Sequence, residues 1–142
     1  MSPLFLIVRI AGRWVAVRAT DVESAVDIGP ITPVPQAPKA IRGLAALRSR
    51  VVTVVDTSVS LGLGKMTNPG RAIIAGIQGH HYALLIEALD DVFPLEPQPL
   101  SSGLAFNGTW RACATGIVER EGEPMLILDL ARLIPNTQPV AG

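Results

Sequence analysis

The sequence predicts an all-β protein with short helical turns, built from two similar β-subdomains. Short apolar runs rich in β-branched residues, such as Val51–Val55, are typical of strands. Glycine-containing turns separate several of these runs, as expected for antiparallel hairpins. A hairpin followed by a capped helical turn occurs twice, which indicates a duplicated module. Together these features predict about ten strands, five in each copy.

The first predicted strands form a hairpin. Residues Leu4–Ile10 are apolar at most positions, so this strand should be buried. Ala11–Gly12 supplies a two-residue turn, and Arg13–Arg18 returns antiparallel. A half-buried strand is expected over Val22–Ile28. The prolines between Gly29 and Pro38 predict an extended connection, because proline has no amide hydrogen to donate within a central strand.

The clearest module runs from Ile41 to Leu63. Two apolar arms flank a charged tip, Arg48–Arg50, and therefore predict a hairpin. Asp56 follows the second arm. Its carboxylate can accept the free amide hydrogens of a following helical turn, which Gly62 then ends.

Three further strands are expected after this module, over residues 71–77, 81–87 and 89–95. The module itself then recurs, since residues 43–56 align without a gap on residues 116–129. In this alignment Gly43 matches Gly116, the tip Arg48–Arg50 matches Glu121–Glu123, and Asp56 matches Asp129. A second short helical turn after Asp129 ends at Pro135.

Length and composition favour one compact domain. The 142 residues are 49% hydrophobic and only 17% charged, which is enough apolar surface for a substantial core. The net charge is zero, so there is no basic field for a nucleic-acid backbone. No apolar run approaches the roughly 20 residues of a membrane-spanning helix. The single cysteine permits no internal disulfide.

Residue types that serve in catalysis or metal binding occur in the sequence, but each has a simpler explanation. His80 and His81 are adjacent, and neighbouring strand residues point to opposite faces, so we interpret them as a turn pair. Cys113 lacks any nucleophile signature and is interpreted as a buried thiol. Asp56 and Asp129 each lie between a predicted strand and a predicted helical turn, where an aspartate is explained as a helix N-cap. The sequence therefore predicts no catalytic residue, no cofactor and no metal.

The first module resembles the signature of CheW-type chemotaxis coupling domains. In that family a glycine, two apolar residues, Asn-Leu-Arg-Gly, an apolar strand and Asp-Leu recur, and residues Ile41–Arg48 and Val51–Asp56 follow this pattern. Here Ala46 replaces the usual asparagine and Ser49 the usual glycine. The resemblance extends over nearly the whole chain, from about residue 4 to residue 134.

The resemblance implies a CheW-like fold of two five-stranded SH3-like β-barrels that share a hydrophobic core. A barrel of about 60 residues buries too little apolar surface alone, which agrees with a shared core. The expected organisation is a single domain over residues 1–137, with subdomains over roughly 12–65 and 71–135. Strand 4–10 should pair between them, and residues 138–142 should form a disordered tail.

The resemblance also implies a function. The family couples chemoreceptors to a CheA-type histidine kinase without catalysing a reaction, so the expected partners are the kinase regulatory domain and the receptor's cytoplasmic tip. The expected location is cytoplasmic, at receptor arrays beneath the inner membrane, with no nucleic acid bound and no membrane insertion. Two alternatives stay open: an adaptor of a pilus or other non-flagellar chemosensory pathway, and a small β-barrel ligand-binding protein.

Five residues form the predicted partner-binding set. Arg48 matches the signature arginine that the family uses in docking, although a solvated hairpin arginine is the alternative. Val22 and Ser24 match positions that the family uses for receptor contact, with Ser24 in place of the usual glutamate. Arg42 and Leu44, from the same signature, complete the set, and for Leu44 core packing is the alternative.

Overall fold

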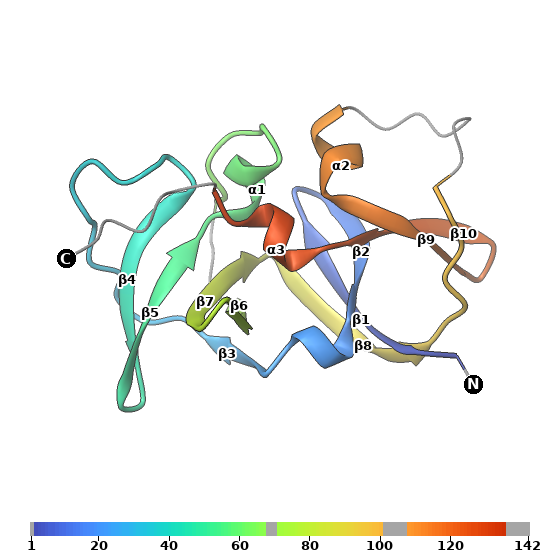
Figure 1. The fold of residues 1–142 in the computed structure, drawn as a ribbon, viewed down its shortest axis with the longest axis horizontal. Coiled ribbons are helices and arrows are strands. Elements are labelled where there is room, and N and C mark those ends of the chain that lie inside the picture. Colours follow the sequence, from blue (N-terminus) through green and yellow to red (C-terminus); the bar gives the residue numbers. More distant parts are fainter. Residues whose placement is uncertain (1, 68–70, 101–107, 136–142) are drawn as a thin grey trace.

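A computed structural model of the protein describes residues 2–67, 71–100 and 108–135 (Figure 1). Within these residues ten strands form two five-stranded sheets, as the sequence predicted. The strands are β1 (Leu4–Ile10), β2 (Arg13–Arg18), β3 (Ser24–Asp27), β4 (Ile41–Leu47), β5 (Arg50–Val55), β6 (Arg71–Ile77), β7 (His80–Ile86), β8 (Ala88–Pro94), β9 (Ala114–Arg120) and β10 (Glu123–Leu128). The short helices are η1 (Ala19–Asp21), α1 (Thr57–Ser60), α2 (Gly108–Cys113) and α3 (Leu130–Leu133).

The two sheets have equivalent strand orders. The sheet β3-β6-β7-β5-β4 is called unit 1, and the sheet β8-β1-β2-β10-β9 is called unit 2. They lie side by side, with α1 and α3 at their junction (Figure 1). In each unit an antiparallel module hairpin joins a second hairpin through one parallel pair, β5 with β7 and β10 with β2.

Sheet membership corrects the expected subdomain boundaries of 12–65 and 71–135. Strands β1 and β2 belong with β8–β10, whereas β6 and β7 belong with β3–β5. Strand β1 pairs with β2 and β8 inside unit 2 and does not pair between the units. The reason is the parallel pairing of β10 with β2, because the second module hairpin joins the N-terminal hairpin, which is distant in the chain, and local pattern does not specify this partner. The expected tail, residues 138–142, lies outside the described residues.

The predicted internal repeat is confirmed. Hairpins β4–β5 and β9–β10 are each followed by a helical turn capped by an aspartate. Asp56 Oδ1 accepts hydrogen bonds from the amides of Ser58 and Val59 at 3.1 and 3.3 Å. Asp129 Oδ1 accepts one from Ala131 N at 3.1 Å. The two modules therefore share both a strand arrangement and a cap.

A single large core joins the two units. It contains buried residues of unit 1, such as Val54 and Leu84, together with residues of unit 2, such as Val15 and Leu126. A smaller cluster around Phe5 lies within unit 2. The helical turns also connect the units, since Ser60 Oγ of α1 donates to the Leu133 carbonyl of α3 at 2.6 Å. No helix in the described ranges has the length and hydropathy to cross a membrane.

Candidate functional site

A groove of about 650 Å³ lies between the two outer strands of unit 1, β3 and β4. Its walls come from the β3 segment on one side and the β4–β5 tip on the other, with β6 behind them. The lining residues are Glu23, Ser24, Val26, Leu47, Arg48, Ser49, Arg50 and Ile74. Two residues of the predicted set, Ser24 and Arg48, therefore meet in one place.

The groove has an apolar floor. Ile74 is buried, and the half-buried side chains of Val26 and Leu47 pack against the shared core. Leu47 has an exposed residue on each side, Ala46 and Arg48, so its side chain points inward. An apolar side chain of a partner could therefore continue the core at this point.

The groove has a charged rim. Arg50 Nη1 lies 3.8 Å from one carboxylate oxygen of Glu23, and His81 Nε2 lies 3.5 Å from the other. Glu23 thus already faces two basic side chains. Arg48, by contrast, is exposed and has no polar partner among the described residues. Its guanidinium is available for a carboxylate of a binding partner.

Arg48 occupies the first turn position with a left-handed backbone, φ 58°. Ala11, Gln78 and Glu121 take similar values in the three other two-residue hairpin turns, where each is followed by a glycine that also has positive φ. In the fourth turn Ser49 follows, and it is not among the described residues with positive φ. The tip that carries Arg48 therefore has its own backbone geometry.

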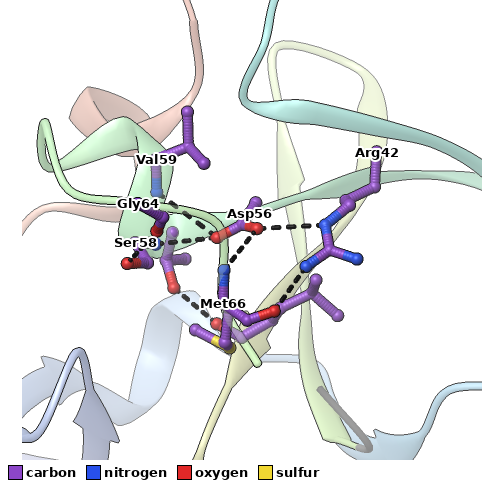
Figure 2. A network of polar contacts seen from close by, with 8 residues as sticks. Arg42, Asp56, Ser58, Val59, Gly64 and Met66 are labelled. Carbon is purple, nitrogen blue, oxygen red and sulfur yellow. Dashed lines mark hydrogen bonds and ion pairs between the residues drawn. The ribbon is translucent and has the colours of Figure 1, made fainter. Parts of the chain in front are cut away.

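Arg42 is half-buried, in a network around the fully buried Asp56 (Figure 2). Its Nε donates to Asp56 Oδ2 at 3.0 Å, and its Nη2 donates to the Met66 carbonyl at 2.6 Å. The same carboxylate oxygen accepts from Met66 N at 3.0 Å. The Arg42 side chain is thus used to neutralise Asp56 and to fix the chain after α1.

Val22 and Leu44 lie outside the groove lining. Val22 is half-buried against the core. Its neighbours Asp21 and Glu23 line a second hollow of about 370 Å³ at the junction of the units. Leu44 is 38% exposed on the outer face of β4, so it is not a core residue.

The predicted partner-binding set lacks six of the groove residues, Glu23, Val26, Leu47, Ser49, Arg50 and Ile74. The sequence identifies Val26 and Ile74 only as strand residues, and Glu23 and Arg50 only as members of a strand and a tip. What joins them is the pairing of β3 with β6, which places Ser24 opposite Ile74. Strand alternation alone cannot reveal which distant strand lies alongside.

The residues considered for chemistry do not converge. His81 faces Glu23, Asp56 and Asp129 cap separate helical turns, and Cys113 is buried with its Sγ 3.5 Å from the Arg132 carbonyl. Within the described ranges no cluster of three or more His, Cys, Asp or Glu side chains could hold a metal ion. Burial raises the pKa of the Cys113 thiol, with Arg132 lowering it and Asp129 raising it to smaller extents.

Cys113 should therefore react slowly with iodoacetamide at pH 8. Burial removes the sulfur from solvent and disfavours the thiolate, which is the reactive form. We expect alkylation at least about tenfold slower in the native protein than in urea, followed by mass spectrometry. The sequence contains one cysteine, so the label reports on this thiol alone. Equal rates in both conditions would contradict the prediction.

Comparisons with known proteins agree with this geometry. A family model described as CheW-like domain matches residues 4–138. The chain belongs to the CheW-like domain family. The resemblance recognised in the first module is thereby confirmed.

Two known proteins are similar to this CheW-like chain over most of its length. It is 26% identical over 112 residues to the chemotaxis protein CheW of Rhizobium meliloti (strain 1021), which covers 77% of this chain and 72% of that protein. Its structure is similar to that of the scaffolding protein TtCheW from Thermoanaerobacter tengcongensis, with a TM-score of 0.81 and 24% identity. That match covers 95% of this chain and 94% of the other, and it confirms the predicted CheW-like fold class.

Proposed function

We propose that this chain is a non-enzymatic adaptor that couples chemoreceptors to a CheA-type histidine kinase in chemotaxis signalling. The observation that carries the proposal is the open groove of unit 1, with its apolar floor and the unpaired Arg48 on its rim, in a chain of the CheW-like family. One similar protein is named a chemotaxis protein and another a scaffolding protein, which supports the same role. The adaptor would act at receptor arrays beneath the inner membrane.

The geometry suits docking rather than reaction. The shared core holds both units as one body, so surfaces on each can hold a partner at a fixed relative position. In the groove an apolar side chain of a partner would bury surface against Leu47, Val26 and Ile74 at about 25 cal/mol per Å². A carboxylate beside it would accept from the Arg48 guanidinium, whose fork suits carboxylates.

A second candidate keeps the fold and changes the pathway. Ser24, Ala46 and Ser49 depart from the usual family residues, and Ser24 and Ser49 line the groove itself. These departures favour an adaptor of a pilus or other non-flagellar chemosensory pathway. Titration with receptor tips and kinase regulatory domains from each type of pathway distinguishes the candidates, because only the matched set should bind.

The proposal is tested by two calorimetric titrations of the purified chain. One uses the regulatory domain of a CheA-type kinase and the other uses the cytoplasmic tip of a chemoreceptor. Saturable binding to each partner is expected. A folded chain that binds neither partner from any chemosensory pathway would refute the adaptor role, as would turnover of a small molecule by the purified chain.

Arg48→Glu should weaken binding of the groove partner by at least about tenfold, because it replaces an unpaired cation at the rim with an anion. The thermal melt should change little, since the side chain is exposed. Lys39→Glu is the matched control, because it makes the same charge change on an exposed residue outside the groove lining. A melt that collapses in Arg48→Glu would show that Arg48 is structural.

A further inference from the structure

Each unit has a seam, defined here as the gap between the two outer strands of its sheet. In unit 1 the seam lies between β3 and β4, and in unit 2 between β8 and β9. The equivalent strand orders make β3 the counterpart of β8 and β4 the counterpart of β9. The partner groove occupies the seam of unit 1. The seam of unit 2 is therefore the place where a second groove would be expected.

The residues at the two seams can be matched one by one. The alignment of Gly43 with Gly116 places Arg120 at the position of Leu47. Both are the last residue of the outer strand, next to the tip. A groove in unit 2 would therefore be lined by Arg120 at the position where Leu47 lines the groove of unit 1.

The opposite wall matches through the strand register. The turns Gln78–Gly79 and Ala11–Gly12 align, so Ala72 corresponds to Phe5 and Ile74 to Ile7. Val26 pairs with Ala72, and Phe93 pairs with Phe5, so Phe93 takes the place of Val26.

The third position follows from the same register. Ser24 pairs with Ile74, and the β8 bulge that contains Asp90 lies opposite Ile7. The set Leu47, Val26 and Ser24 in unit 1 is therefore replaced by Arg120, Phe93 and Asp90 in unit 2.

In unit 2 the Arg120 side chain contacts both of the other two across the seam. Arg120 Nη1 lies 2.7 Å from Asp90 Oδ2, and the guanidinium carbon lies 3.9 Å from the centroid of the Phe93 ring. One arginine on β9 thus holds both an ion pair and a cation–π contact to β8. In unit 1 the shorter, uncharged side chains leave the groove open.

We infer that Arg120 is a plug that closes the seam of unit 2, so that a partner side chain can insert into the seam of unit 1 but not into that of unit 2. The plug is defined as Arg120 together with the two residues that its guanidinium contacts, Asp90 and Phe93. The inference about docking rests on the proposed function, whereas closure of the seam does not. Arg120 is on this view a specificity-determining residue, because it decides which of two equivalent seams a partner can enter.

The first experiment transfers the plug to unit 1. The variant carries Leu47→Arg, Val26→Phe and Ser24→Asp, and it is titrated by calorimetry with the partner that binds the groove in the wild type. We expect affinity to fall at least about tenfold with circular dichroism unchanged. The matched control is Leu47→Met, which keeps the floor apolar and should bind within about twofold of the wild type. A folded plugged variant that binds as tightly as the wild type would overturn the inference.

The second experiment removes the plug and needs no partner. Arg120→Leu is compared with the wild type by amide hydrogen exchange followed by nuclear magnetic resonance. Loss of both contacts should raise exchange at β8 amides at least about fivefold, with β3 and β6 unaffected. Arg71→Leu is the control, since it removes an exposed arginine that lies 3.6 Å from Asp27. Unchanged exchange at β8 would show that Arg120 does not hold the seam.

The two experiments separate failure of the inference from failure of the proposed function. A wild-type chain that binds no partner refutes the adaptor role, and hydrogen exchange still tests closure of the seam. If the wild type binds and its chemical-shift changes on binding already include β8 and β9, the seam of unit 2 is open to partners and the plug is refuted while the adaptor role stands.

Discussion

Replacing Arg42 with methionine should lower the free energy of unfolding by about 3–5 kcal/mol. Asp56 is fully buried, and Arg42 is the cation that lies 3.0 Å from its carboxylate. Methionine fills similar space but leaves the buried carboxylate without a counter-charge. It also removes the donor to the Met66 carbonyl. Urea denaturation followed by circular dichroism measures the loss, and the m-value should stay unchanged.

Arg71→Met is the matched control for this prediction. Arg71 also lies near a carboxylate, at 3.6 Å from Asp27, but both side chains are solvent-exposed. Its loss should therefore change stability by less than about 1 kcal/mol. The double variant Arg42→Met, Asp56→Asn should regain part of the lost stability, because no buried charge remains. If Arg42→Met is as mild as Arg71→Met, the network of Figure 2 does not stabilise the fold.

Local features of the fold were predictable from the sequence for a local reason. A hairpin needs two apolar arms and a short tip, and a helix N-cap needs a residue such as aspartate after the second arm. Residues 43–56 supply each of these, so the hairpin and the cap could be predicted from this segment. The match to residues 116–129 then extends the prediction to the second module. Both modules have the expected form.

The arrangement of the modules was not predictable in the same way. The parallel pairs β5 with β7 and β10 with β2 join segments whose patterns are equally compatible with other neighbours. The groove depends on these pairings, because Ile74 reaches Ser24 only once β6 lies beside β3. Sequence reasoning therefore identified Arg48 and Ser24 one at a time, through family resemblance, without the apolar floor between them.

Arg42 illustrates a further limit. Arg42 and Arg48 belong to the same signature and the same predicted hairpin, and composition gives no means of separating them. The structure separates them by burial: Asp56 accepts from Arg42 within the protein, whereas Arg48 faces solvent at the tip. The partner-binding role predicted for Arg42 competes with this internal contact, so Arg42→Met should lower stability while the folded fraction still binds the groove partner.

Gly43→Ala should be more damaging to the fold than most core substitutions, with a loss of at least about 3 kcal/mol in the free energy of unfolding. Gly43 has φ 143°, a conformation that side chains disfavour. A Cβ at this position would overlap the Thr32 carbonyl oxygen and lie 2.9 Å from Pro33 Cα. That segment is held in place by two hydrogen bonds between the backbones of Thr32 and Leu44, at 2.8 and 2.9 Å.

Two other glycines separate the clash from the backbone strain. Gly79 has φ 83° with no atom within 4 Å of its Cβ position, so Gly79→Ala should lose only about 1–2 kcal/mol through strain. Gly116 is the counterpart of Gly43, and its Cβ would lie 2.7 Å from the Gln98 carbonyl oxygen. Gly116→Ala therefore tests whether the second module also depends on close contact between its glycine and a neighbouring backbone segment, here that of Gln98. Thermal and urea unfolding of the three variants should rank Gly43→Ala as the least stable. A Gly43→Ala protein no weaker than Gly79→Ala would mean that the strand segment around Thr32 can move away from β4 at little cost.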